Sequence, residues 1–114
     1  MTVKNIKIRI YHGEVSAIGP GKADLLEAIA QAGSISAAAR DMGMSYKRAW
    51  DLVDTMNKCF KKPLVITATG GSQGGGAEVT EFGRDVLRRY RELETKAAQS
   101  VLNELSALNT LLAE

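Results

Sequence analysis

The strongest constraint on the fold lies between residues 33 and 45, where two glycine–serine signals bracket a short run of helix-forming residues. Gly33 followed by Ser34 is typical of one helix ending and the next being capped, and Gly43 with Ser45 repeats the signal. The run between them contains three consecutive alanines and is long enough for about two helical turns. Small side chains let helices cross closely, and a glycine accommodates a tight turn. The pattern therefore predicts a helix-turn-helix unit.

The flanking residues supply the other two helices of a small bundle. From Lys22 to Ala32 the apolar residues recur on one helical face, and a further helix is predicted from Tyr46 to Phe60, where Pro63 ensures its end. In this last helix Ala49, Val53, Met56 and Phe60 form the core face.

Two hairpins are predicted around these helices. Apolar and basic residues alternate from Ile6 in the segment 3–11, which predicts a half-buried strand that pairs with 15–18 through a turn. A second hairpin is predicted from the strands 64–69 and 77–80, whose connection holds five glycines in seven residues. The expected fold is mainly α with small β-hairpins: a winged helix-turn-helix domain over residues 1–80.

A long C-terminal helix is predicted over residues 81–114, which contain no proline and no glycine after Gly83. Its apolar stripe projects from a small body and needs a partner, so we expect this helix to dimerise the protein. The alternative is a tail that folds back near Ser100 or Asn103. The expected interface residues are Tyr90, Leu93, Ala97, Val101, Leu105, Leu108 and Leu112.

Candidate binding residues gather at the start of the helix 46–60. Hydroxyl, phenol and cationic side chains suit phosphates and base edges, so this end is predicted to enter the major groove of double-stranded DNA. Tyr46 and Trp50 are open to a second interpretation, as core aromatic residues. The expected DNA-binding residues are Ser34, Ser36, Ser45, Tyr46, Lys47, Arg48, Trp50 and Asp51, with Thr69, Gly71, Ser72, Gln73 and Gly74 in the glycine-rich wing.

The charge distribution agrees with this interpretation. Residues 40–62 carry six basic side chains against three acidic ones, whereas residues 92–114 carry four acidic side chains against one basic one. A basic middle suits a polyanion, although two ordinary solvated faces would give the same balance.

Other functional classes have little support. Cys59 and His12 are each the single residue of their type, so we expect no zinc site, disulfide, catalytic cluster or cofactor. The glycine-rich loop has no lysine, which argues against nucleotide binding. Without a membrane-spanning run or signal peptide, the protein is expected in the cytoplasm. The alternative to DNA binding is a winged helix used for protein–protein contact, whereas an enzyme is the least supported class.

Several stretches resemble known regulators. Residues 32–39 look like the helix-turn-helix of LysR-type regulators. Residues 45–51, 56–57, 68–71 and 74–76, with Val79, Thr80 and Gly83, resemble the N-terminal domain of the ModE family of molybdate-responsive regulators. The resemblance implies a winged helix-turn-helix homodimer that binds a palindromic operator and regulates molybdenum-related genes.

One departure from that family concerns the ligand. Members of the ModE family bind molybdate in separate C-terminal oxyanion-binding domains, whereas this sequence ends at Glu114, directly after the expected dimer helix. The resemblance therefore implies a single-domain relative, and we expect no molybdate binding by this chain alone.

Overall fold

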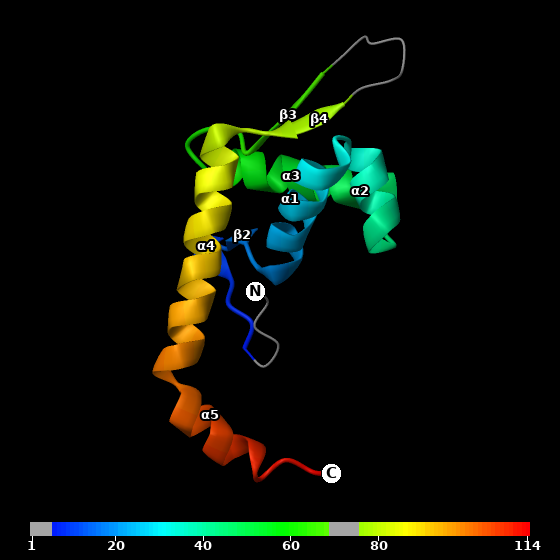
Figure 1. Ribbon diagram of the computed structural model, residues 1–114. Helices are drawn as coiled ribbons and strands as arrows, with labels where there is room; N and C mark the ends of the chain where they lie inside the picture. Colours follow the sequence, from blue (N-terminus) through cyan, green and yellow to red (C-terminus); the bar gives the residue numbers. More distant parts are fainter. Residues whose placement is uncertain (1–5, 69–75) are drawn as a thin grey trace.

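The computed structural model describes residues 6–68 and 76–114, and these form a small helical body from which two further helices project (Figure 1). The elements follow in the order β1 (Ile10–His12), β2 (Val15–Ile18), α1 (Pro20–Ala32), α2 (Ile35–Met42), α3 (Tyr46–Cys59), β3 (Val65–Thr67), β4 (Ala77–Val79), α4 (Glu81–Ser100) and α5 (Leu102–Asn109). The described residues thus form five helices and two antiparallel hairpins, which is a winged helix-turn-helix with an attached helical arm.

The predicted helix ends are confirmed. Gly33 and Gly43 both adopt the left-handed conformation, with φ of 78° and 68°, and each ends the preceding helix. Ser34 and Ser45 then cap the following helices, because their hydroxyl oxygens accept hydrogen bonds from the backbone amides three residues later, each at 3.1 Å. These two turns fix the path of α1, α2 and α3.

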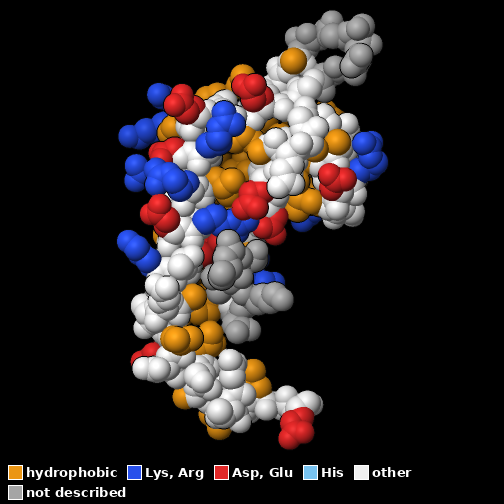
Figure 2. All heavy atoms as spheres, viewed as in Figure 1, with side chains coloured by type: hydrophobic (Ala, Val, Ile, Leu, Met, Phe, Trp, Pro, Cys, Tyr) orange, Lys and Arg blue, Asp and Glu red, His pale blue; other side chains and the backbone are white. Residues whose placement is uncertain are grey.

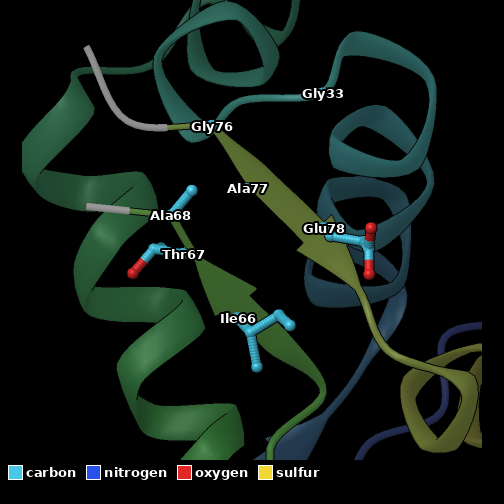
Figure 3. Close-up of a pocket in the computed structure, with 7 residues that line it drawn as sticks. All are labelled: Gly33, Ile66, Thr67, Ala68, Gly76, Ala77 and Glu78. Atoms are coloured by element: carbon cyan, nitrogen blue, oxygen red, sulfur yellow. The ribbon is translucent and has the colours of Figure 1, made fainter. Parts of the chain in front are cut away.

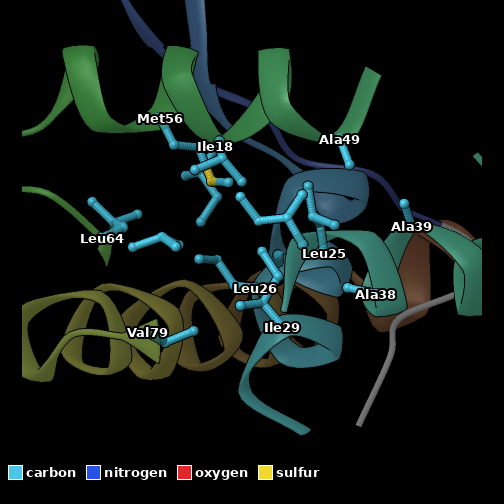
Figure 4. Packing of buried hydrophobic residues seen from close by; sticks show 14 of the residues in the cluster. Ile18, Leu25, Leu26, Ile29, Ala38, Ala39, Ala49, Met56, Leu64 and Val79 are labelled. Carbon is cyan, nitrogen blue, oxygen red and sulfur yellow. The ribbon is translucent and has the colours of Figure 1, made fainter. Parts of the chain in front are cut away.

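The core lies where these three helices meet the base of the second hairpin (Figure 4). Ala38, Ala39 and Ala49 are buried between α2 and α3, which confirms that small side chains permit the close crossing. Leucine and isoleucine side chains of α1 fill the centre, and Met56, Leu64 and Val79 close the side toward α4.

The first hairpin differs from its prediction. The strand begins only at Ile10 and pairs with β2 through a register shift between Ile10 and Tyr11. Residues 6–9 are not part of it; instead the Ile8 carbonyl oxygen accepts a hydrogen bond from the Tyr90 hydroxyl on α4 at 2.6 Å. The alternating segment is therefore tied to α4 rather than extended as a strand.

The second hairpin has the predicted pairing. Val65 lies opposite Val79, and Thr67 lies opposite Ala77. Val65 and Val79 are buried against the body, so the base of the wing belongs to the core.

The long C-terminal helix is broken, which corrects the prediction of one continuous helix over 81–114. Helix α4 ends at Ser100, and Val101 leaves the helical conformation at φ −119° and ψ 19°. The Ser100 hydroxyl donates a hydrogen bond to the Ala97 carbonyl oxygen at 2.8 Å, a local bond that competes with the helix ladder. Helix α5 changes direction there and continues away from the body without folding back as a hairpin (Figure 1). No described helix is long and apolar enough to cross a bilayer.

The start of α4 is packed directly on the wing, and this predicts the effect of one substitution. A Cβ atom at Gly83 would lie 2.3 Å from the Leu64 carbonyl oxygen and 2.9 Å from Val79 Cγ1. Because the first contact is backbone, the segments must move apart. Gly83→Ala should lower the free energy of unfolding by about 1–3 kcal/mol in urea denaturation.

The matched control is Gly21→Ala, another helical glycine. A Cβ atom at Gly21 meets nothing within 4 Å, so that variant should be as stable as the wild type or slightly more stable. Equal unfolding midpoints for the two variants would contradict the tight packing at Gly83.

Candidate nucleic-acid interface

Helix α3 presents one buried face and one exposed face. Ala49, Val53 and Met56 are buried in the core, so the opposite side of the helix faces outward. Tyr46, Lys47, Arg48, Trp50 and Asp51 are all exposed. Trp50 is 45% exposed and Tyr46 is 55% exposed, which places both aromatic residues on the surface and not in the core. The predicted residues of this helix therefore share one accessible surface at its N-terminal end.

The charged side chains of α3 are paired along the helix. Lys47 lies 3.1 Å from Asp51, and Lys58 lies 2.9 Å from Asp54, each pair one turn apart. The hydrogen bond that the Lys58 ammonium group donates to the Asp54 carboxylate raises the pKa of Lys58 above its ordinary value. Such exposed pairs contribute little to stability. An incoming phosphate can therefore take the lysine from its aspartate at small cost.

Helix α2 contributes two serines with different roles. The Ser34 side chain is occupied as the helix cap, whereas Ser36 is exposed in the first turn. Ser36 is thus free to reach a phosphate, and Ser34 acts by fixing the helix start whose backbone amides face outward.

The wing is held against the turn between α1 and α2 (Figure 3). The Ala77 amide donates a hydrogen bond to the Gly33 carbonyl oxygen at 2.9 Å, and the Ala68 amide donates one to the Gly76 carbonyl oxygen at 2.9 Å. A hollow of about 290 Å³ lies beside this junction. The predicted wing residues Thr69, Gly71, Ser72, Gln73 and Gly74 lie outside the described residues.

Asn57 was not among the predicted site residues, yet it joins α3 to the wing. Its side-chain oxygen accepts hydrogen bonds from the Leu64 and Val65 amides at 2.7 and 3.2 Å, and its side-chain nitrogen donates to the Val65 carbonyl oxygen at 3.0 Å. An amide side chain can satisfy both a donor and an acceptor of the passing backbone. The signal in the sequence was an asparagine one turn after the core residue Val53.

A partly buried ion cluster that the sequence did not reveal joins α4 to α1. Arg91 lies 2.7 Å from Asp24 and 2.7 Å from Glu27, both on α1, and 2.9 Å from Glu94 on its own helix. Glu94 is 2% exposed. Asp24 and Glu27 are more than sixty residues from Arg91 in sequence, so no local pattern indicates these contacts.

The expected interface residues divide between the body and the arm. Tyr90 is buried in its own protomer, so it is not part of the interface that we propose below. Leu93, Leu108 and Leu112 are exposed, whereas Ala97, Val101 and Leu105 are half-buried. Within the described residues no group of three or more His, Cys, Asp or Glu side chains could hold a metal ion.

The buried Tyr90 predicts a dependence of stability on pH. Burial raises the pKa of the Tyr90 phenol to about 12, and the nearby Glu94 carboxylate adds to the effect. The phenol of the unfolded chain has a pKa of about 10. The contribution of Tyr90 to the free energy of unfolding should therefore be complete below pH 10 and should be lost as the pH rises toward 12. Urea unfolding of wild type and Tyr90→Phe should therefore give a stability difference that shrinks above pH 10.

At neutral pH the free energy of unfolding of the Tyr90→Phe variant should be about 1 kcal/mol lower than that of the wild type, because the hydrogen bond to the Ile8 carbonyl oxygen is lost. Tyr11→Phe is the matched control, since Tyr11 is 58% exposed and lies on the surface. A stability difference between the wild type and Tyr90→Phe that stays the same above pH 10 would contradict the raised pKa of Tyr90.

Comparison with known proteins agrees with this geometry. Residues 22–84 match the family described as bacterial regulatory helix-turn-helix protein, lysR family. The chain is 46% identical over 91 residues to the molybdenum transport protein ModE of Azotobacter vinelandii, covering 80% of this chain and 33% of that protein. It is also 46% identical over 101 residues to the molybdenum-pterin-binding protein MopA of Rhodobacter capsulatus, covering 82% and 38% of the two chains.

A third relative is the DNA-binding transcriptional dual regulator ModE of Escherichia coli K12, which is 42% identical over 99 residues, covering 82% of this chain and 37% of that protein. The chain therefore spans about a third of the length of these relatives. Among solved structures, ArgP from Mycobacterium tuberculosis aligns with a TM-score of 0.49 and 22% identity, over 81% of this chain and 30% of that one.

Proposed function

Because the chain belongs to the lysR family of bacterial regulatory helix-turn-helix proteins, we propose that it is a transcription regulator that binds specific DNA sequences as a homodimer. The observation that carries the proposal is the exposed N-terminal end of α3, where Tyr46, Lys47 and Arg48 project from a helix whose other face is buried. A cationic helix end on a rigid body fits the major groove.

The three parts of the interface have different tasks. Arg48 and Lys47 lie where a recognition helix reaches base edges, and an arginine there can donate two hydrogen bonds to a guanine. Ser36 and the first turn of α2 suit a backbone phosphate. The wing leaves the body next to Gly33, so it follows the DNA beside the groove that α3 occupies. Sequence is read by α3, and the other contacts position it.

The dimer partner that we propose is a second copy bound through the arm. Leucine side chains lie along α5 and the residues that follow it, and Figure 2 shows hydrophobic side chains over this lower part of the molecule. Leu102, Leu108, Leu111 and Leu112 are 60–80% exposed. Monomeric proteins rarely leave so many large apolar side chains close together in water. An identical arm would cover it and would present two copies of α3 to a palindromic operator.

The relatives suggest which genes are controlled. Their names refer to molybdenum transport, molybdenum-pterin binding and transcriptional regulation. We therefore propose that this regulator controls molybdenum-related genes in the bacterial cytoplasm.

A second candidate function follows from the two exposed aromatic residues. Tyr46 and Trp50 form an apolar edge beside the cations of α3, and such an edge also suits a protein partner. Absence of DNA binding by the wild type, together with weak retention on heparin, would favour this alternative.

Gel mobility shift with DNA from upstream of the protein's own gene tests the proposed function. Lys47→Ala and Arg48→Ala should each weaken binding about 10- to 100-fold if their side chains reach bases, since a good base contact contributes about 1–3 kcal/mol. Lys58→Ala is a matched control, because Lys58 is also exposed and paired with an aspartate one turn away, but at the other end of α3. It should bind nearly as well as the wild type.

Full affinity in both the Lys47→Ala and the Arg48→Ala variant would remove this end of α3 from the interface. Absence of binding by the wild type at low salt would overturn the proposed function itself.

Sedimentation equilibrium tests the dimer. The wild type should sediment at twice its 12.3 kDa chain mass at micromolar concentration. Leu108→Asp with Leu112→Asp should shift it to the monomer, because two charges would have to be buried in the interface. Asn103→Asp adds a charge to the same helix without removing a leucine and should remain dimeric. A stable wild-type monomer with native circular dichroism would contradict the dimer.

A further inference from the structure

A basic hollow of about 190 Å³ lies beside α3, on the side where the chain enters α1. Two cationic side chains from outside the recognition helix line it, Arg9 before β1 and Lys22 in the first turn of α1. Arg48 of α3, which is proposed above to reach base edges, borders the same hollow. Gly19, Pro20 and Gly21 form its floor, and no acidic residue lines it. We infer that this hollow seats a phosphate of the DNA backbone next to the groove that α3 enters.

The two cations from outside α3 are available to a ligand. Among the described residues neither of them forms an ion pair, whereas Lys47, Lys58 and Arg91 all do. Lys22 Nζ donates to the Ser16 carbonyl oxygen, which leaves its other hydrogens free. Partial burial lowers the pKa of Lys22, so its ammonium group has already lost part of its hydration. A phosphate oxygen would restore that lost interaction.

The backbone of α1 supports the same ligand. Its cap residue is Gly19, which has no side chain to accept from the first-turn amides, and Pro20 follows at the first helical position. The amide donors of this turn therefore lie at the floor of the hollow without a capping side chain. Arg9 is held over the same floor, since a Cβ atom at Gly19 would lie 3.0 Å from Arg9 Cγ.

The position of the hollow relative to the wing favours DNA over a free anion. The hollow lies at the first turn of α1, and the wing is anchored at Gly33, just beyond its last turn. Because α1 has 13 residues, these ends are about 20 Å apart. Helix α3 packs against α1, and its first turn borders the hollow through Arg48. A major groove is about 12 Å wide and is bordered by a phosphate backbone on each side. The wing and the hollow can thus contact the two opposite backbones while α3 occupies the groove.

The inference rests on the proposed function and adds residues to it. Arg9 and Lys22 lie outside the recognition helix, so no base contact is expected from them. Their effect should be the same on every DNA sequence, and it should appear in the salt dependence of binding, because each phosphate that the protein neutralises contributes about 0.9 to the slope of log K against log salt.

The experiment compares Arg9→Gln with Lys7→Gln by fluorescence anisotropy on the upstream duplex and on an unrelated duplex, over a range of salt concentrations. Both variants remove one positive charge from the same exposed segment, but only Arg9 lines the hollow. Arg9→Gln should weaken DNA binding about five- to tenfold near 0.1 M salt on both duplexes. It should also reduce the slope of log K against log salt by about 0.9 for each protomer whose hollow contacts a phosphate. Lys7→Gln should leave the slope unchanged.

The outcomes separate the two proposals. Equal slopes for the wild type and Arg9→Gln, with DNA binding intact, overturn the phosphate seat and leave the proposed function standing. Absence of DNA binding by the wild type itself overturns both proposals.

A calorimetric titration with inorganic phosphate tests whether the hollow binds a free anion instead. A saturable site that Arg9→Gln abolishes, with DNA affinity unchanged, would assign the hollow to a free anion and would contradict the inference. Lys22→Gln provides a second variant of the same seat and should also reduce the slope.

Discussion

The arrangement of the whole molecule depends on how α4 is attached to the body, and Arg91 is the centre of that attachment. Its guanidinium group bridges Asp24 and Glu27 on α1 and Glu94 on α4, where the Glu94 side chain is almost fully buried. Because Glu94 is buried, any arrangement that takes Arg91 away from it would leave an uncompensated charge in the interior and is strongly penalised. With the Tyr90 hydrogen bond to Ile8 one residue away, the cluster fixes the direction of the arm relative to α3. In a dimer that joins through the arm, this joint would set the distance between the two recognition helices.

A second set of contacts makes the interface itself rigid. The Gly33 carbonyl oxygen accepts a hydrogen bond from the Ala77 amide of β4. The Asn57 side chain accepts one from the Leu64 amide, just before β3. Helix α1, helix α3 and the base of the wing therefore move as one unit. Sites held on such rigid elements need less ordering when they bind, so a larger share of the contact energy becomes affinity.

The locally determined parts of the structure could be predicted from the sequence, and the parts set by distant partners could not. Gly33, Ser34, Gly43 and Ser45 act within a few residues, so their pattern located the helix-turn-helix and the start of α3.

The first strand was placed too early because the Ile8 carbonyl oxygen accepts a hydrogen bond from Tyr90 on a distant helix. Tyr90 was assigned to the dimer interface because the sequence does not show this contact. The break at Val101 was missed because the apolar stripe continues through it. At the candidate site, the cations of α3 were found, whereas Asn57 and the hollow at Arg9 depend on tertiary packing.

The central claim is that two copies of α3, joined through the arm, read a symmetric DNA site. Selection of bound duplexes from a random-sequence library, followed by sequencing, tests this claim directly. The account predicts enrichment of an inverted repeat whose half-sites are centred one or more helical turns apart, at multiples of about 10 base pairs. Failure to enrich any sequence over the starting library, or enrichment of a single half-site without a symmetric partner, would contradict it.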